Sequence, residues 1–199
     1  MTASLHNQIP SYVVGGFDFY ISQDETSILS AIFKPESIKK DAFFIRQGDR
    51  PERIAYVVHG VFRSYINTED GNDITKYFYM EKSILFSYAA YIQRTGSSSS
   101  IQALEDSEIL TANMADLEKA LDSDPDLANL FKAKLDEVMI MKDRQVSSFK
   151  LLNSSDRYRQ FLVDYPGLEN RVKQYHLASY LGITPVSLSR IRKKLELIK

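Results

Sequence analysis

The pattern of apolar residues changes once along the chain, near Met114, and this change limits how the chain can fold. Before Met114, short runs rich in Val, Ile, Tyr and Phe alternate with turn signals. After Met114, apolar residues recur every three or four positions, which is the period of a helix packed on one face. Strands followed by helices are typical of an α+β chain, so we expect a β-domain first and helices after it.

The strand-like part extends from about residue 41 to residue 113. Its runs are AFFIRQ, IAYVVHG, VFRSYIN, ITKYFYM, SILFSY, SSIQAL and EILTANM. Asp70-Gly71 separates two of these runs and predicts a hairpin. Short strands without intervening helices favour a β-sandwich or jelly roll. Ahead of them, residues 24–33 have the pattern of a short amphipathic helix.

The longest periodic segment extends from Pro125 to about Leu152 and has no glycine and no second proline. Asp124 and Pro125 are typical of a helix start. The apolar stripe covers about 40 Å of helix at ~1.5 Å per residue. Such a stripe can be covered by the chain's own β-domain or by a second copy. We favour the second copy, and therefore a homodimer through residues 125–152.

The net charge of −1 conceals an uneven distribution. Residues 171–199 contain seven cations and one acid, a charge of +6, so the first 170 residues carry −7. A basic end on an acidic body indicates either a module that binds a polyanion or a solvated helix face that is basic by chance.

Several classes of protein are excluded or disfavoured by composition. The chain has no cysteine, so it has no disulfide and no cysteine-held zinc or iron–sulfur site. Its histidines, His6, His59 and His176, are too dispersed to indicate a metal site. No signal peptide is visible, and no stretch approaches the ~20 apolar residues of a membrane span. We expect a cytoplasmic protein without metal, cofactor or membrane contact.

Residues 173–195 have the pattern of a helix–turn–helix. Ala178 is small enough for two helices to cross closely, and Gly182 permits the positive φ that opens the turn. Thr184 is expected to cap the second helix, with Pro185 in its first position. Apolar residues of both helices should face inward: Leu177, Leu181, Ile183, Leu188, Ile191 and Leu195.

The opposite face of the second helix suits the DNA major groove, because small polar residues precede a cluster of cations. The residues expected to contact DNA are Thr184, Val186, Ser187, Ser189, Arg190, Arg192, Lys193 and Lys194. Arg190 can donate two hydrogen bonds to a guanine, and the lysines can neutralise phosphates. An ordinary helical hairpin with a basic outer face is the less favoured interpretation.

Residues 155–195, SDRYRQFLVDYPGLENRVKQYHLASYLGITPVSLSRIRKKL, closely resemble the C-terminal domain of Crp/Fnr-type transcription regulators, especially the short versions common in Bacteroidetes. FIRQGDRPERIAYVVHGVFRSYINTEDGNDITKYF and SIQALEDSEIL resemble the cyclic-nucleotide-binding-like β-roll of that family. The resemblance covers about residues 20–199. It implies a jelly roll and a helical DNA-binding domain, and a homodimer that places one recognition helix in each half of a palindromic site.

This resemblance divides the chain into three parts. We expect a β-roll sensor domain over residues 1–122, a dimerisation helix over 123–152 and a helix–turn–helix domain over 153–199. The last part is small and should lean on the others for stability. Relatives commonly have Glu at the position of Val186, so the preferred DNA sequence of this chain should differ from theirs.

The phosphate-binding region departs from the family. Cyclic-nucleotide binders have a Gly-Glu-Leu turn and an Arg-Ser or Arg-Thr pair there, whereas this chain reads SILFSYAAYIQRTGSSSSIQAL. Burying a phosphate without a paired cation is costly, so we expect no cyclic AMP binding in the family manner. Either another effector binds or the pocket is empty. Candidate residues for another effector are Tyr88, Tyr91, Arg94, Ser98 and Ser99.

The expected function is a sequence-specific regulator that binds double-stranded DNA, with RNA polymerase as a further candidate partner. The alternative is a ligand sensor that acts through protein contacts and has a vestigial DNA-binding half. A cupin-type enzyme is disfavoured, because cupins need clustered histidine and glutamate ligands and only His59 is available. No catalytic residue is predicted.

Overall fold

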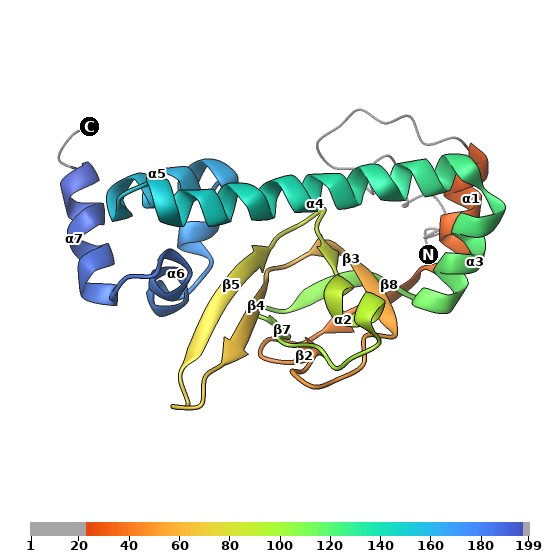
Figure 1. Cartoon of the computed structure of the whole chain (residues 1–199), viewed down its shortest axis with the longest axis horizontal. Helices are drawn as coiled ribbons and strands as arrows, with labels where there is room; N and C mark the ends of the chain where they lie inside the picture. Colours follow the sequence, from red (N-terminus) through yellow and green to blue (C-terminus); the bar gives the residue numbers. More distant parts are fainter. Residues whose placement is uncertain (1–22, 197–199) are drawn as a thin grey trace, which may run out of the picture.

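The computed structural model describes residues 23–196, in which a β-roll is followed by a long helix and a group of shorter helices (Figure 1). The predicted α+β order is therefore confirmed. The strands are β1 (Lys34–Ile38), β2 (Phe43–Ile45), β3 (Arg53–His59), β4 (Phe62–Asn67), β5 (Asp73–Tyr79), β6 (Ile84–Leu85), β7 (Ser100–Ala103) and β8 (Ser107–Asn113). They form two antiparallel sheets in the orders β1-β8-β3-β6 and β2-β7-β4-β5.

The core of the β-roll lies between the two sheets. Apolar residues of both sheets pack as one cluster, which includes Val57, Phe62, Leu85, Ile101 and Ile109. The hairpin predicted at Asp70-Gly71 is confirmed, because β4 and β5 pair through Asn67 and Asp73 and Gly71 has a φ of +79°.

Two details of the strand region differ from the prediction. A short helix, α2 (Tyr88–Gln93), interrupts the region expected to contain strands alone, and only residues 84–85 of the run SILFSY form a strand. Only Ala90 of α2 is buried, so its sequence carries no helical stripe. The pattern also does not predict β1, because that strand is polar and lies at a sheet edge, where Pro35 is tolerated.

The remaining helices are α1 (Gln23–Ile32), α3 (Met114–Ser123), α4 (Pro125–Leu151), α5 (Ser154–Asp164), the 3-10 helix η3 (Leu168–Asn170), α6 (Gln174–Leu181) and α7 (Pro185–Glu196). The Asp124 carboxylate accepts hydrogen bonds from the amides of Asp126 and Leu127, both at 3.0 Å, as the predicted cap requires. Asn153 caps α5 in the same way and separates it from α4.

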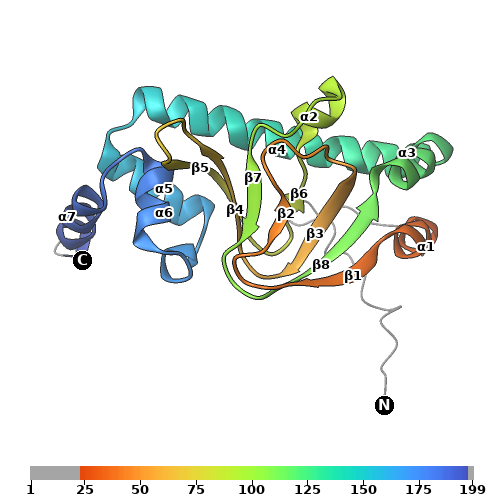
Figure 2. The same ribbon diagram turned by 90° about the horizontal axis from the view of Figure 1, so that it is seen from below.

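The long helix α4 connects the two ends of the molecule. It begins beside α1 and α3, passes along the β-roll, and reaches the group formed by α5, α6 and α7 (Figures 1 and 2). α7 lies at the outer end of that group, away from the β-roll (Figure 2). Within residues 23–196, no helix is both long and apolar enough to cross a membrane.

Candidate nucleic-acid interface

The turn between α6 and α7 has the geometry that the sequence predicts for a helix–turn–helix. α6 ends at Gly182, which has a φ of +65°. Ala178 is buried where the helices meet. The hydroxyl of Thr184 accepts a hydrogen bond from the amide of Ser187 at 3.1 Å, so the predicted cap is confirmed.

The inner faces of α6 and α7 share one core. Leu177, Leu181 and Leu188 are fully buried, and Ile183, Ile191 and Leu195 pack against them. All six residues expected to face inward do so. This packing sets the direction in which the remaining residues of α7 point, because residues three and four apart share a helix face.

The outer face of α7 is open to solvent. Six of the eight residues expected to contact DNA are exposed: Thr184, Val186, Ser189, Arg190, Lys193 and Lys194. Val186 is 61% exposed, although it is apolar. In the part of the chain that the structure describes, Arg190, Lys193 and Lys194 form no ion pair. Their charges are therefore available to a polyanion.

Arg192 differs from the other cations of α7. Its Nε donates to the hydroxyl of Tyr158 at 3.1 Å, and its Nη2 donates to the carbonyl of Glu169 at 3.2 Å. The guanidinium also lies 5.7 Å from the centre of the Tyr158 ring. Arg192 thus holds α7 to α5 and η3, and we leave it out of the proposed DNA contacts. Ser187, which is half-buried beside the cap, lies at the edge of the exposed face.

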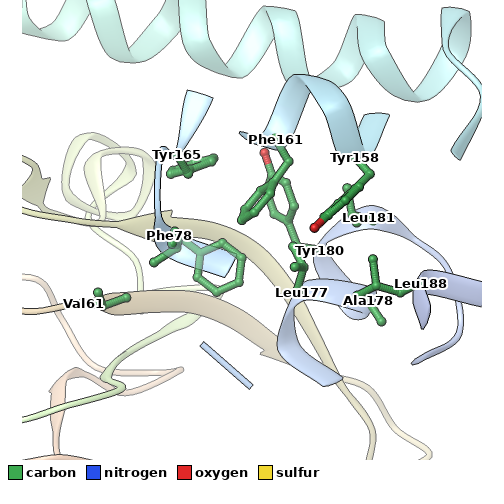
Figure 3. Close-up of a cluster of buried hydrophobic side chains, with 11 residues drawn as sticks. Val61, Phe78, Tyr158, Phe161, Tyr165, Leu177, Ala178, Tyr180, Leu181 and Leu188 are labelled. Atoms are coloured by element: carbon green, nitrogen blue, oxygen red, sulfur yellow. The ribbon is translucent and has the colours of Figure 1, made fainter. Parts of the chain in front are cut away.

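The helix–turn–helix packs on the β-roll through a shared apolar cluster. Phe78 of β5 and Val61, next to β4, contribute from the β-roll (Figure 3). The helices contribute Tyr158, Phe161, Tyr165, Leu168, Leu177, Ala178, Tyr180, Leu181 and Leu188. The Phe78 ring lies 5.4 Å from that of Tyr180 and 6.2 Å from that of Phe161. The expectation that the small C-terminal domain leans on the rest of the chain is confirmed.

A buried ion pair lies beside this cluster. Arg63 is 4% exposed, and its two terminal nitrogens donate to the two carboxylate oxygens of Asp73 at 2.8 and 2.7 Å. From α6, the hydroxyl of Tyr175 donates to Asp73 at 2.7 Å, and the hydroxyl of Ser179 accepts from the Thr75 amide at 3.0 Å. Burial raises the pKa of Asp73, but the hydrogen bonds from Arg63 and Tyr175 outweigh burial and leave that pKa below its ordinary value.

A second ionic contact joins the two parts of the chain at η3. Arg171 donates to both oxygens of Glu81, at 3.0 and 2.7 Å, and also contacts Glu105. The hydrogen bonds from Arg171 lower the pKa of Glu81 to about 2. We call the contacts of Tyr175 with Asp73 and of Arg171 with Glu81 the docking contacts.

The serine turn, residues 97–100, occupies the region of the expected phosphate site. Ser97 and Ser99 are buried, and their hydroxyls bond within the protein: Ser97 with Ser87 at 2.9 Å and Ser99 with Ser64 at 3.2 Å. These hydroxyls are neutral and bond to one another, so they supply no positive charge to balance a phosphate. That a cyclic phosphate lacks its cation there stays a prediction.

The five candidate effector residues are not gathered at one place. Tyr88 lines a cavity between α4 and the β-roll, whereas Tyr91 and Arg94 line a different cavity beside Pro51. Ser98 is exposed and Ser99 is buried in the serine turn. These five residues therefore do not line one common site.

The residues that dock the helix–turn–helix were missed by the sequence reasoning. Arg171 is 90 positions from Glu81 and Tyr175 is 102 positions from Asp73, so the sequence does not pair them. The available signal is weak: Arg63 stands in the middle of the apolar run VFRSYIN, where a charge needs a partner.

Several large apolar side chains of α4 are exposed to solvent. Met139, Ile140 and Val146 are 60%, 54% and 54% exposed, whereas Phe131, Leu135 and Val138 are partly covered by the β-roll. The β-roll therefore covers part of the apolar stripe of α4, and the exposed residues leave room for a further partner.

Comparisons with known proteins identify a matching domain family and solved structures of similar fold. Residues 35–124 match the model of the cyclic nucleotide-binding domain family. Among solved structures, the chain is similar to FixK2 from Bradyrhizobium japonicum, with 18% identity, a TM-score of 0.73, and coverage of 83% of this chain and 85% of the other. No curated protein is matched by the chain.

Two further structures extend the comparison. The c-di-GMP-responsive global regulator CLP from Xanthomonas campestris has 17% identity and a TM-score of 0.69, with coverage of 86% of this chain and 90% of the other. A Eubacterium rectale protein described as a transcriptional regulator of the Crp/Fnr family has 16% identity and a TM-score of 0.66, with coverage of 89% and 84%. The chain has the fold of these Crp/Fnr-type regulators, and residues 35–124 contain the match to the cyclic nucleotide-binding domain family.

Proposed function

We propose that the protein is a cytoplasmic, non-enzymatic transcription regulator that binds specific sequences of double-stranded DNA through α7. The observation that carries this proposal is the exposed face of α7, on which Arg190, Lys193 and Lys194 are free of ion pairs in residues 23–196 while the opposite face is buried. A rigid helix with free cations and short residues at its start suits the major groove.

The regulator is a homodimer on a palindromic operator. The exposed apolar residues of α4 support this part of the proposal, because a second copy of the same helix would cover them. A two-fold dimer presents two copies of α7, which requires two half-sites of related sequence. Binding is independent of cyclic AMP, which is supported by the neutral serine turn.

Selection of bound sequences from random double-stranded DNA tests the proposal. We expect enrichment of a palindrome with half-sites about 10 base pairs apart. Affinity for that sequence should fall steeply as salt is raised, and added cyclic AMP should leave it unchanged. Selected pools without a shared sequence would contradict specific binding, and would favour a sensor whose DNA-binding half is vestigial.

A further inference from the structure

One large apolar residue of α7, Val186, is open to solvent. It is 61% exposed and packs in none of the apolar clusters formed by residues 23–196. The other branched apolar residues of the helix are Leu188, which is buried, and Ile191 and Leu195, which pack against the shared cluster. Val186 therefore lies outside the core, and its side chain is free to contact another molecule.

The residues next to Val186 in the chain carry no charge. Residues 182–189 contain no acidic or basic side chain, whereas residues 190–194 contain four cations. The hydroxyls of Thr184 and Ser187 lie 3.0 Å apart and bond to each other, and that of Thr184 also accepts from the Ser187 amide. The exposed face of α7 thus begins with an apolar group and continues with cations.

Val186 and Arg190 lie on the same side of α7, because residues four apart share a helix face. At ~1.5 Å per residue they are separated by about 6 Å along the helix. One base pair occupies ~3.4 Å of duplex, so in the proposed complex the base at Val186 lies within about two base pairs of the guanine at Arg190. Ser189, which is exposed, is short enough to let the helix approach the bases.

We propose that Val186 selects a thymine in each half-site, through contact between its methyl groups and the thymine C5 methyl in the major groove. Of the four bases, only thymine presents a methyl group there, and the others present polar edges. Valine neither donates nor accepts a hydrogen bond, so a polar base edge against it would lose its water without gaining a partner. Its β-branched side chain has one preferred rotamer in a helix, which fixes the direction of the methyl groups.

This inference rests on the proposed function and deepens it, because it names a base that the operator must contain. Arg190 and Val186 then read different features of the half-site. Arg190 recognises hydrogen-bond acceptors on a guanine, and Val186 recognises an apolar group on a thymine. The two contacts can be removed separately, one from the protein side and one from the DNA side.

The experiment replaces each thymine of the selected operator in turn by deoxyuridine, in both half-sites, and measures the affinity of the full chain by fluorescence anisotropy. Deoxyuridine lacks the C5 methyl and keeps every hydrogen-bonding group of thymine. We expect one position at which affinity falls by about fourfold for each half-site, the effect of one buried methyl group. At that position, 5-methylcytosine should bind better than cytosine, because the methyl group is restored. Equal affinity for deoxyuridine and thymine at every position would overturn the proposal.

Two variants assign the methyl contact to Val186. Val186→Ala removes its methyl groups and should bind the thymine and deoxyuridine operators with equal affinity. Because Val186 is exposed, this change should leave the fold intact. Val163→Ala, at a valine of α5 that is 74% exposed, is the matched control and should keep the full preference for thymine. A preference for thymine that survives Val186→Ala would show that another residue reads the methyl group, and the proposal would be wrong.

The outcomes separate this inference from the proposed function. A chain that selects a palindrome but shows no preference between thymine and deoxyuridine overturns the role of Val186 alone. A selected half-site without any thymine does the same. A chain that selects no shared DNA sequence overturns the proposed function, and the role of Val186 with it.

Discussion

At the scale of single residues, the cations of α7 have two different roles. Arg190 and Lys193 are exposed and free of ion pairs within residues 23–196. We expect Arg190→Ala to lose discrimination between the selected operator and a mismatched site by about 1–3 kcal/mol, because a bidentate arginine contact reads a base. Lys193→Ala should weaken binding to both sequences alike, because it contacts a phosphate. Fluorescence anisotropy on both DNAs measures this; equal losses for Arg190→Ala would contradict its role.

Arg192 has a structural role, because its hydrogen bonds lie within the protein. Arg192→Met should lower the free energy of unfolding by about 1–2 kcal/mol, because it leaves the carbonyl of Glu169 and the hydroxyl of Tyr158 without their charged donor. Arg190→Met is the matched control and should stay within about 0.5 kcal/mol of the parent. Urea unfolding compares them, and equal stability of the two variants would show that Arg192 has no structural role.

At the scale of elements, the docking contacts join the helix–turn–helix to the β-roll beside the shared apolar cluster. Asp73 connects β5 to α6, and its loss leaves the buried guanidinium of Arg63 without a carboxylate. Asp73→Asn should therefore destabilise the chain by about 3 kcal/mol or more, because a buried charge is left unpaired. Asp70→Asn in the exposed turn of the same hairpin is the control. Hydrogen exchange should show lost protection in α6 for the first variant and not for the second; identical protection would refute the docking role.

We expect the same contact region to make the fold sensitive to acid. His176 of α6 is 8% exposed, and its Nδ1 is buried without a hydrogen bond. Burial, and then the charge of Arg63, lower the pKa of His176 to about 4, although Asp73 and Asp41 act in the other direction. The unfolded chain takes up this proton below about pH 6.5, whereas the folded chain does so only near pH 4. Stability should therefore fall between those two values as pH is lowered.

Urea unfolding at pH 7 and pH 5 tests this sensitivity. The parent should lose stability at the lower pH, and His176→Gln, which cannot titrate, should lose much less. The contribution of Glu81 falls outside this interval, because its pKa of about 2 and its ordinary value of 4.5 both lie below pH 5. If His176→Gln loses as much stability between pH 7 and pH 5 as the parent does, other groups cause the acid sensitivity.

At the scale of the whole molecule, α4 carries the proposed dimer. Ile140→Glu and Val146→Glu place a charge among its exposed apolar residues and should shift the protein from dimer to monomer at micromolar concentration. Val163→Glu changes an apolar residue of α5 that is even more exposed, and it should leave the dimer intact. Sedimentation measures the state, and a parent that is monomeric throughout would exclude α4 as the interface.

Local sequence determined several helix ends and helix faces of this protein, although it did not predict α2 or β1. Asp124 with Pro125, Gly182, and Thr184 with Pro185 specify helix ends through backbone geometry and capping, which depend on neighbouring residues alone. The inward faces of α6 and α7 follow from spacing, since a helix brings every third and fourth residue to one side. The exposed cations of α7 could be predicted for the same reason, but the exception, Arg192, could not, because its partners lie on α5 and η3.

Only the tertiary structure decided how the parts meet. Arg63 and Tyr175 are 112 positions apart and meet at one carboxylate, that of Asp73, because β5 and α6 pack together. Short-range signals specify helices, strands and caps, whereas the burial of a charge depends on surfaces brought together from distant parts of the chain.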